Sequence, residues 1–220
     1  MQMVYNTHMR YKKRRQYVWS ADLAYAVGLL ASDGCLQKDG RHIDLTSVDY
    51  EQLENFNVAL QLDRRISKKQ ASKDHSGYRV QFSDVALYDF LLEVGLMPAK
   101  SQKIGSLNVP KEFFMDFVRG VFDGDGTVYG FWDKRWRSSY TFSISFASAS
   151  KAFLSYMREE LHATLGTEGS ICTGKRALRL QYAKKDSVLL YRHMYASPSS
   201  LFLSRKKSKL EKCISISENR

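Results

Sequence analysis

The chain has 220 residues, of which 44% are hydrophobic and 13% aromatic, and 34 Lys and Arg against 23 Asp and Glu give it a formal net charge of +11. This length and apolar content can fill one large core or two smaller ones, which excludes a disordered protein. The basic excess favours nucleic acid or an anionic membrane as partner, and no apolar run approaches the roughly 20 residues that span a bilayer.

Residues 1–18 are predicted to be a basic arm, because charge gathers at residues 10–15 and no apolar signal segment follows. The three cysteines, Cys35, Cys172 and Cys213, show no CxxC spacing. This argues against both a disulfide framework and a zinc site and favours a reducing compartment. We expect an intracellular protein without a secretion signal, located in the cytoplasm of a prokaryote or in an organelle.

Two apolar helical runs then end in the same chemistry. Residues 26–34 read AVGLLASDG and residues 118–126 read VRGVFDGDG, each with one internal glycine and a terminal Asp-Gly pair. The acids are Asp33 and Asp125. A repeated helix that delivers one carboxylate per copy predicts a two-fold site in which two acids converge.

After the first motif the pattern predicts a hairpin, a helix, a second hairpin and a closing helix. Asp39-Gly40 is a strong two-residue turn signal for the first hairpin, and Pro98 ends the half. The expected strands are 35–38, 41–46, 65–70 and 78–82, and the expected helices are 50–60 and 85–94.

The second half repeats this order with a longer first hairpin tip. The sequence Arg-Val-Gln-Phe at 79–82 is echoed by Arg-Leu-Gln-Tyr at 179–182. The expected strands are 127–129, 140–147, 167–172 and 177–182, and the expected helices are 151–165 and 187–195. We therefore predict an α+β fold of two pseudo-symmetric αββαββα repeats, 19–100 and 110–210, with a linker at 101–109 and a tail at 211–220.

The predicted strands alternate between apolar and polar residues, as in a sheet with one buried and one open face. Leu36, Ile43 and Leu45 point one way, whereas the neighbouring polar residues point the other. The open faces carry Arg, Lys, Gln, Ser and Thr, the residue types that read base edges and hold phosphates. An ordinary solvated sheet face is the alternative.

The two motif copies resemble those of the LAGLIDADG homing endonucleases in their single-chain form. The first copy keeps Gly28, Leu29, Asp33 and Gly34, and the second keeps Gly120, Asp123, Asp125 and Gly126. The resemblance covers residues 19–210. It implies that the motif helices pack at a pseudo-two-fold axis, with Gly28 and Gly120 in close contact, and that each antiparallel sheet forms part of a DNA-binding saddle.

Two carboxylates 4 Å apart repel by about 4 kcal/mol at an effective dielectric constant of 20, and a helix C-terminus adds negative charge. Oxygen ligands and retained water suit Mg²⁺ as the compensating ion, and Mn²⁺ or Ca²⁺ can occupy such a site. The metal ligands implied by the resemblance are the carboxylates of Asp33 and Asp125 and the backbone carbonyls of Ser32 and Gly124.

The resemblance also implies a basic residue near each scissile phosphate. Lys100 and Lys206 follow the last predicted helix of each half, with Lys103, Arg205 and Lys207 as alternatives and plain surface lysines as a further one. The resemblance further implies that a polar residue after the second strand of each half contacts the attacking water through solvent, and Ser47 and Ser148 occupy those positions. The candidate DNA-binding residues are Gln37, His42, Asp44, Ser47, Lys69, Arg79, Gln81, Trp132, Lys134, Arg135, Arg137, Thr141, Ser143, Ser148, Arg179 and Gln181.

The activity that the resemblance implies is that of a homing endonuclease, or meganuclease, acting as a monomer. It would be intron-encoded and would cut both strands of a long, asymmetric double-stranded DNA target with Mg²⁺. An RNA maturase that binds its host intron and a non-catalytic DNA-binding regulator on the same scaffold remain as alternatives. The expected partner is double-stranded DNA, or intron RNA in the case of a maturase. No membrane partner is expected.

Overall fold

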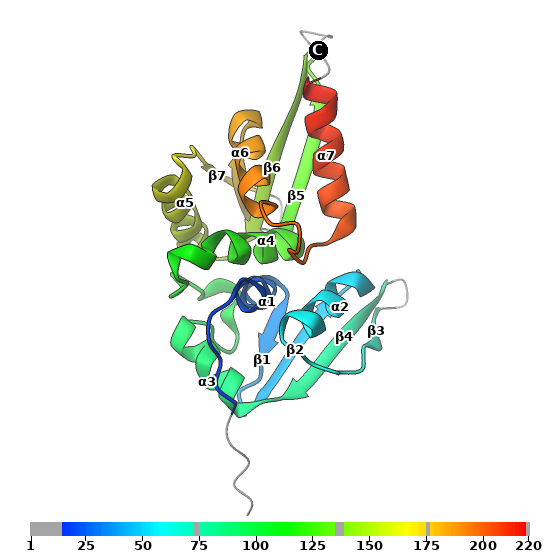
Figure 1. Cartoon of the computed structure of the whole chain (residues 1–220), viewed down its shortest axis with the longest axis vertical. Helices are drawn as coiled ribbons and strands as arrows, with labels where there is room; N and C mark the ends of the chain where they lie inside the picture. Colours follow the sequence, from blue (N-terminus) through cyan, green and yellow to red (C-terminus); the bar gives the residue numbers. More distant parts are fainter. Residues whose placement is uncertain (1–14, 73–74, 135–138, 175–176, 219–220) are drawn as a thin grey trace, which may run out of the picture.

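The computed structural model describes residues 15–72, 75–134, 139–174 and 177–218. Two halves are stacked end to end, each built around a four-stranded antiparallel sheet, and the helices α1 (Ala21–Ser32) and α4 (Phe114–Asp125) meet between them (Figure 1). In each sheet the first strand along the chain pairs with the second, the second with the fourth and the fourth with the third, so the two sheets have the same topology. This confirms the α+β fold of two similar repeats.

The described residues of the first half form three helices and four strands, and these elements follow the predicted order. Ser20 caps α1, because its hydroxyl accepts a hydrogen bond from the Leu23 amide at 3.1 Å. The elements are α1 (Ala21–Ser32), β1 (Gly34–Leu36), β2 (His42–Ser47), α2 (Tyr50–Ala59), β3 (Ser67–Ser72), β4 (His75–Ser83) and α3 (Val85–Val94).

The second half follows two short 3₁₀ turns, η1 (Lys100–Gln102) and η2 (Lys111–Phe113). Its first hairpin is longer than that of the first half, as the sequence predicted. The second half also contains a final helix, Ser204–Glu218, that the sequence did not predict. The elements are α4 (Phe114–Asp125), β5 (Gly126–Trp132), β6 (Tyr140–Ser148), α5 (Lys151–Leu165), β7 (Ser170–Thr173), β8 (Leu178–Tyr182), α6 (Lys184–Met194) and α7 (Ser204–Glu218).

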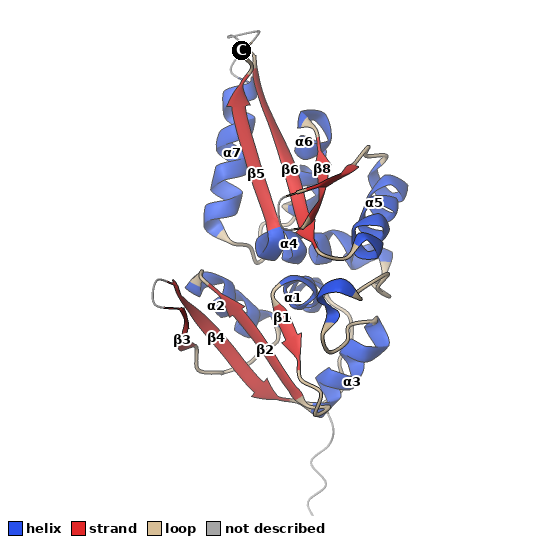
Figure 2. Cartoon of the chain, turned by 180° about the vertical axis from the view of Figure 1, so that it is seen from behind, coloured by secondary structure: helices blue, strands red, loops and turns tan. Residues whose placement is uncertain are grey.

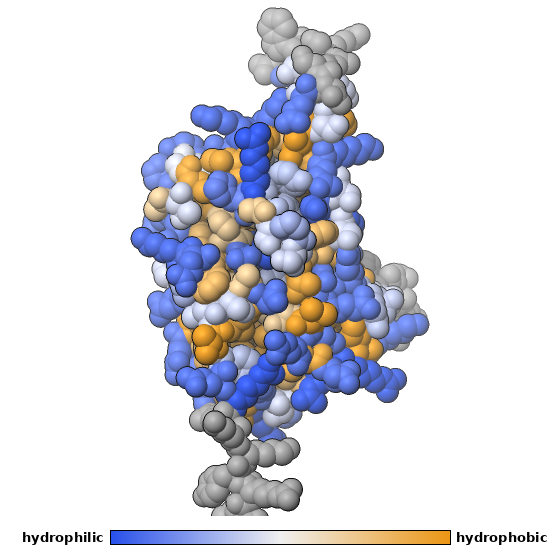
Figure 3. All heavy atoms as spheres, in the orientation of Figure 1, coloured by the Kyte–Doolittle hydropathy of each residue, from blue (hydrophilic) through white to orange (hydrophobic). Residues whose placement is uncertain are grey.

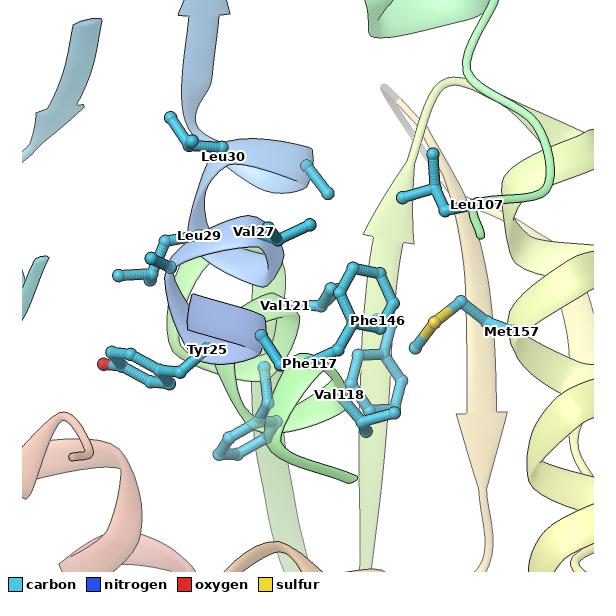
Figure 4. Packing of buried hydrophobic residues seen from close by; sticks show 14 of the residues in the cluster. Tyr25, Val27, Leu29, Leu30, Leu107, Phe117, Val118, Val121, Phe146 and Met157 are labelled. Carbon is cyan, nitrogen blue, oxygen red and sulfur yellow. The ribbon is translucent and has the colours of Figure 1, made fainter. Parts of the chain in front are cut away.

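The core runs without a break from one half to the other through the α1–α4 interface (Figure 4). Tyr25 and Val27 of α1 and Phe117 and Val121 of α4 are fully or almost fully buried there. The helices approach so closely that a Cβ added to Gly120 would lie 2.1 Å from the Tyr25 carbonyl oxygen. The internal glycines therefore have a packing role that offsets their low helix propensity.

The sheets lie in front of most of the helices when the molecule is seen from behind (Figure 2). The opposite side carries helices and is largely hydrophilic, with apolar patches between the charged side chains (Figure 3). No helix in the described part of the chain combines the length and the apolar composition that a membrane crossing requires.

Two predicted boundaries need correction. The expected tail from residue 211 continues α7 as far as residue 218, because Leu210, Cys213 and Ile214 are buried at helical spacing. The expected linker at 101–109 also contributes to the core, since Ile104 and Leu107 are buried and the Leu107 carbonyl accepts a hydrogen bond from the Tyr156 hydroxyl at 2.8 Å.

The turn between β1 and β2 is wider than the predicted two-residue turn. The last ladder pair is Leu36 with Ile43, extended by a 2.9 Å hydrogen bond from the Gln37 amide to the His42 carbonyl. Asp39 accepts from two backbone amides beyond it, and Gly40 has a φ of 76°. The Asp-Gly pair thus closes a longer loop through the aspartate side chain.

Part of the predicted basic arm packs against the first half. The Arg15 guanidinium donates to the Leu60 carbonyl at 2.9 Å, and the Tyr17 hydroxyl donates to Asp84 at 2.8 Å. The other arm residues, 1–14, lie outside the described part of the chain.

Candidate functional site

The two motif acids stand at neighbouring helix ends. Asp33 is the C-cap of α1 and Asp125 is the last residue of α4. A Cβ added to Gly124 would lie 1.9 Å from the Ser32 hydroxyl and 3.2 Å from a carboxylate oxygen of Asp33. Because the backbone next to one acid touches the other acid, the two helix ends form a single site, as the repeat predicted.

Burial makes both acids hard to ionise, and the charge of Asp33 adds to this effect at Asp125. Burial, and after it the negative charge of Asp33, raises the pKa of Asp125 to about 6. Burial also raises the pKa of Asp33, against a hydrogen bond from Gln52 and the charges of Lys206 and Lys100. Among the described residues no donor is hydrogen-bonded to the Asp125 carboxylate, so it is available to a ligand.

Two lysines bind the backbone beside these acids. Lys100 Nζ donates to the Ser32 carbonyl at 2.8 Å, and Lys206 Nζ donates to the Gly124 carbonyl at 2.7 Å and the Phe122 carbonyl at 2.8 Å. Lys100 and Lys206 are only 6% and 8% exposed. Burial lowers the pKa of both ammonium groups, and that of Lys206 falls to about 8.

The alternative basic residues make other contacts. Lys103 is exposed, the Arg205 guanidinium is paired with Asp49 at 2.6 Å from Nε, and Lys207 Nζ lies 4.3 Å from the centre of the Phe202 ring. The residues that reach the two motif carbonyls are therefore Lys100 and Lys206.

Gln52 is a site residue that the sequence reasoning missed. Its Nε2 donates to Asp33 at 3.1 Å, while its Oε1 accepts from the Ser47 hydroxyl at 3.0 Å. Ser47 thus acts on Asp33 through the Gln52 amide. The available signal was an amide on the buried face of α2, because a buried polar side chain requires a partner.

The second half lacks this arrangement. Ser148 accepts a hydrogen bond from the Ser150 amide at 3.1 Å, and the α5 position that matches Gln52 holds buried Phe153. The two acids therefore have unequal surroundings, one with an amide donor and the other without.

A cavity of 310 Å³ opens beside Asp33, between the helix ends and the first sheet. Acidic, amide and basic side chains share its wall, which suits a charged ligand better than an apolar one. Its lining comprises Asp33, Thr46, Ser47, Val48, Asp49, Gln52, Lys69, Ser76, Gly77, Gly124 and Arg205.

Asp123, the other acid of the α4 motif, has structural contacts instead. It is fully buried and accepts hydrogen bonds from the Tyr25 hydroxyl at 2.9 Å and the Leu203 amide at 2.8 Å. Burial raises its pKa to about 6. Asp123 therefore ties α1 to the segment before α7, which carries Lys206.

The oxygen atoms at the helix ends are suitable ligands for a hard divalent cation. Asp33 and Asp125 supply carboxylate oxygens, and the Ser32 and Gly124 carbonyls each keep one lone pair besides the lysine contact. The described residues contain no group of three or more His, Cys, Asp or Glu that could hold a metal. Two carboxylates with carbonyls and water nevertheless match the preference of Mg²⁺ for oxygen and for retained water.

The outward face of the first sheet carries most of the predicted DNA-binding residues of that half, with two corrections. Ser47 lies on the inward side of β2, is only 8% exposed and donates to Gln52. Asp44 is only 5% exposed, because the Gln37 amide at 3.0 Å and the Arg79 guanidinium at 2.9 Å cover its carboxylate. Asp44 orients its neighbours instead of presenting a free group. His42 is paired with Asp39, and Lys69 Nζ donates to the Thr46 hydroxyl at 3.2 Å.

The outward face of the second sheet carries Thr141, Ser143, Arg179 and Gln181, and the Gln181 amide donates to the Ser143 hydroxyl at 3.2 Å. Gln81 and Gln181 occupy matching places opposite Asp44 and Ser145, as the repeated Arg-x-Gln predicted.

Trp132 differs from the prediction. It pairs with Tyr140, and the two rings lie 5.1 Å apart; Tyr140 in turn contacts Cys213 of α7. Because strand residues alternate, Trp132 belongs to the face that α7 covers, and the outward aromatic residues are Tyr129 and Phe131. Lys134 is exposed beyond the strand, whereas the predicted Arg135 and Arg137 lie outside the described residues.

Comparison with known proteins places the fold. No family model and no curated protein matches the chain. It is similar to the homing endonuclease I-WcaI bound to its DNA recognition sequence, with 14% identity, a TM-score of 0.62 and 88% of each chain covered. It is also similar to I-DmoI in complex with DNA and Ca, with 15% identity, a TM-score of 0.56 and coverage of 87% of this chain and 97% of that one.

A further similar structure is not named as a nuclease. Full-length DUF199/WhiA from Thermatoga maritima matches at 12% identity with a TM-score of 0.57, over 90% of this chain but only 62% of that one. Its N-terminal domain is named a LAGLIDADG domain. At these identities the likeness shows the fold and leaves the activity to the site. The chain has the LAGLIDADG fold in its two-repeat form.

Proposed function

We propose that the chain is a site-specific double-strand DNA endonuclease that acts as a monomer and depends on a divalent cation, Mg²⁺ before others. The observation that carries the proposal is the pair of acids, Asp33 and Asp125, at touching helix ends with one buried lysine beside each end. One chain thus supplies two half-sites, which matches a duplex with two phosphodiester bonds to hydrolyse.

The protein groups have separable tasks. The carboxylates of Asp33 and Asp125, with the Ser32 and Gly124 carbonyls, would hold the cation, which supplies charge neutralisation and a more acidic water. Lys100 and Lys206 place positive charge beside the same carbonyls, where negative charge grows on a phosphate under attack. Gln52 orients the Asp33 carboxylate by donating to it.

The sheets supply the binding surface in this proposal. Their outward faces lie on the side of the molecule seen in Figure 2, and Arg79, Gln81, Arg179 and Gln181 project from matching strands. The net charge of +11 adds attraction for a phosphate backbone. The similar endonuclease structures bound to DNA support a duplex as the ligand.

The test is cleavage of a randomised double-stranded DNA library with Mg²⁺ and with EDTA. We expect metal-dependent cuts at one long shared site, which also supplies the target. Asp33→Asn and Asp125→Asn should each abolish double-strand cutting and keep DNA binding. Asp22→Asn is the matched control, because Asp22 is exposed in the first turn of the same helix as Asp33 and should cut normally.

Double-strand cutting that survives in either variant would remove that acid from the mechanism. If the parent chain binds DNA or structured intron RNA tightly in a salt-sensitive way without cutting, the proposal fails. The chain would then be a regulator or a maturase on the same scaffold.

A further inference from the structure

The longest hairpin of the molecule presents two aromatic rings on the open face of its sheet. Tyr129 and Phe131 of β5 are 63% and 44% exposed, and their ring centres lie 5.4 Å apart. Their cross-strand partners on β6 are Ser143 and Thr141. The pair therefore forms an apolar patch bordered by hydroxyl groups.

The matching place in the first half is polar and lies just beyond β1. Tyr129 is the fourth residue after Asp125, as Gln37 is the fourth after Asp33, and Phe131 likewise matches Asp39. Gln37 donates to Asp44, which also binds Arg79, so the first sheet presents a charged network. On the outward face of the second sheet, Arg179 is the one charged residue among the described strand positions.

This contrast has a chemical counterpart in a DNA duplex. The major groove offers donors and acceptors at every base pair, but its one apolar group is the C5-methyl of thymine. Aromatic carbons match that methyl, whereas the polar network of the first sheet matches base nitrogen and oxygen atoms. Exposed Lys134 lies three residues beyond Phe131 and adds positive charge for the flanking backbone.

We propose that Tyr129 and Phe131 read thymine methyl groups, so that the half-site bound by the second sheet requires thymine where the half-site bound by the first does not. This inference rests on the proposed function, because it takes the outward sheet faces as the surface that meets the duplex. If it holds, the two repeats recognise different chemical groups on the bases of one asymmetric target.

The experiment replaces each thymine of the selected target by deoxyuridine, which removes one methyl and keeps every hydrogen-bonding group. Equilibrium binding is measured without divalent cation, so that no strand is cut. Removal of a methyl that is buried in the complex should weaken binding about fourfold, the equivalent of about 0.8 kcal/mol. The effect should fall on thymines of one half-site.

The protein side of the test assigns the effect to the rings. In Tyr129→Ser and Phe131→Ser the duplex with thymine should bind several-fold more weakly, and the penalty for deoxyuridine should disappear. Gln37→Ser is the matched control in the first sheet and should leave the deoxyuridine penalty unchanged. Circular dichroism verifies that the variants are folded.

Tight duplex binding that ignores deoxyuridine in both half-sites would overturn the inference and leave the proposed function standing. A selected half-site without thymine opposite the second sheet would do the same. Absence of specific duplex binding, with single-stranded nucleic acid bound through Tyr129 instead, would overturn both.

Discussion

The α1–α4 contact can be tested by adding one methyl group to either helix. A Cβ on Gly28 would stand 2.2 Å from the Phe117 carbonyl oxygen, and one on Gly120 would stand 2.1 Å from the Tyr25 carbonyl oxygen. The atoms hit are helix backbone, which has no rotamer to escape into. Gly28→Ala and Gly120→Ala must therefore push the two helices apart by roughly 1 Å to restore van der Waals distance.

The size of the effect follows from two opposing contributions. A gap of 0.5–1 Å forfeits about a quarter to a half of each dispersion contact, and overpacking of a core costs about 1–3 kcal/mol. The rigid backbone places both variants at the upper end of that range. Alanine regains about 1 kcal/mol of helix propensity. The net loss is about 2 kcal/mol of unfolding free energy, or about 4–8 °C in Tm for a chain of this size.

Urea unfolding followed by circular dichroism measures this loss. Gly105→Ala is the matched control, because a Cβ there meets nothing within 4 Å and the backbone needs no left-handed conformation. It should leave stability unchanged or raise it by about 0.4–1 kcal/mol. If Gly28→Ala and Gly120→Ala unfold at the same urea concentration as the parent, the close helix contact is refuted.

The other predictions concern charge and polarity. Because burial raises the pKa of Asp123 to about 6, its contribution to the free energy of unfolding is complete below about pH 4 and falls by about 3 kcal/mol as the pH rises through 6. In Asp123→Asn, the free energy of unfolding measured from pH 4 to 7 should lose this pH dependence. An unchanged pH dependence in the variant would refute the assignment to Asp123. Gln52→Met removes the donor to Asp33 and should slow cleavage of the selected target about tenfold while duplex affinity stays within twofold; equal loss of both would make Gln52 merely structural. Arg179→Ala should lower the slope of log affinity against log salt by about one, and no change in slope would remove Arg179 from the phosphate contacts.

The parts of the site that the sequence could locate are those fixed by local pattern. An apolar helical run that stops at Asp-Gly places an acid at a helix end, and a second copy places its partner. The repeated Arg-x-Gln fixed the register of Gln81 and Gln181, because period two leaves one choice of face. Lys100 and Lys206 came from the resemblance; both lie beside the motif carbonyls, and their role at a scissile phosphate stays a prediction.

The parts that the sequence did not locate depend on neighbours distant in the chain. Helix α7 has a short apolar stripe among lysines and serines, and it is ordered by packing on β5 and β6. Trp132 was predicted to bind DNA from the hairpin tip, because the predicted strand ended at residue 129. Because β5 extends through residue 132, its side chains alternate up to that residue, so Tyr129 and Phe131 face outward and Trp132 faces the other side of the sheet. Gln52 needed the partner Asp33, which no helical pattern shows.

The balance of charge at the helix ends argues for an ionic ligand there. The two lysines donate to carbonyls and not to the carboxylates, so they offset the acids only at a distance. Asp33 has the Gln52 amide, but Asp125 has no hydrogen-bond donor among the described residues, and its pKa stays near 6 in spite of both lysines. For stability alone an asparagine or serine at residue 125 would remove this repulsion. In the proposed function, a cation bound between the two acids would stabilise this half-buried carboxylate, and a DNA phosphate would be the anion that completes the site.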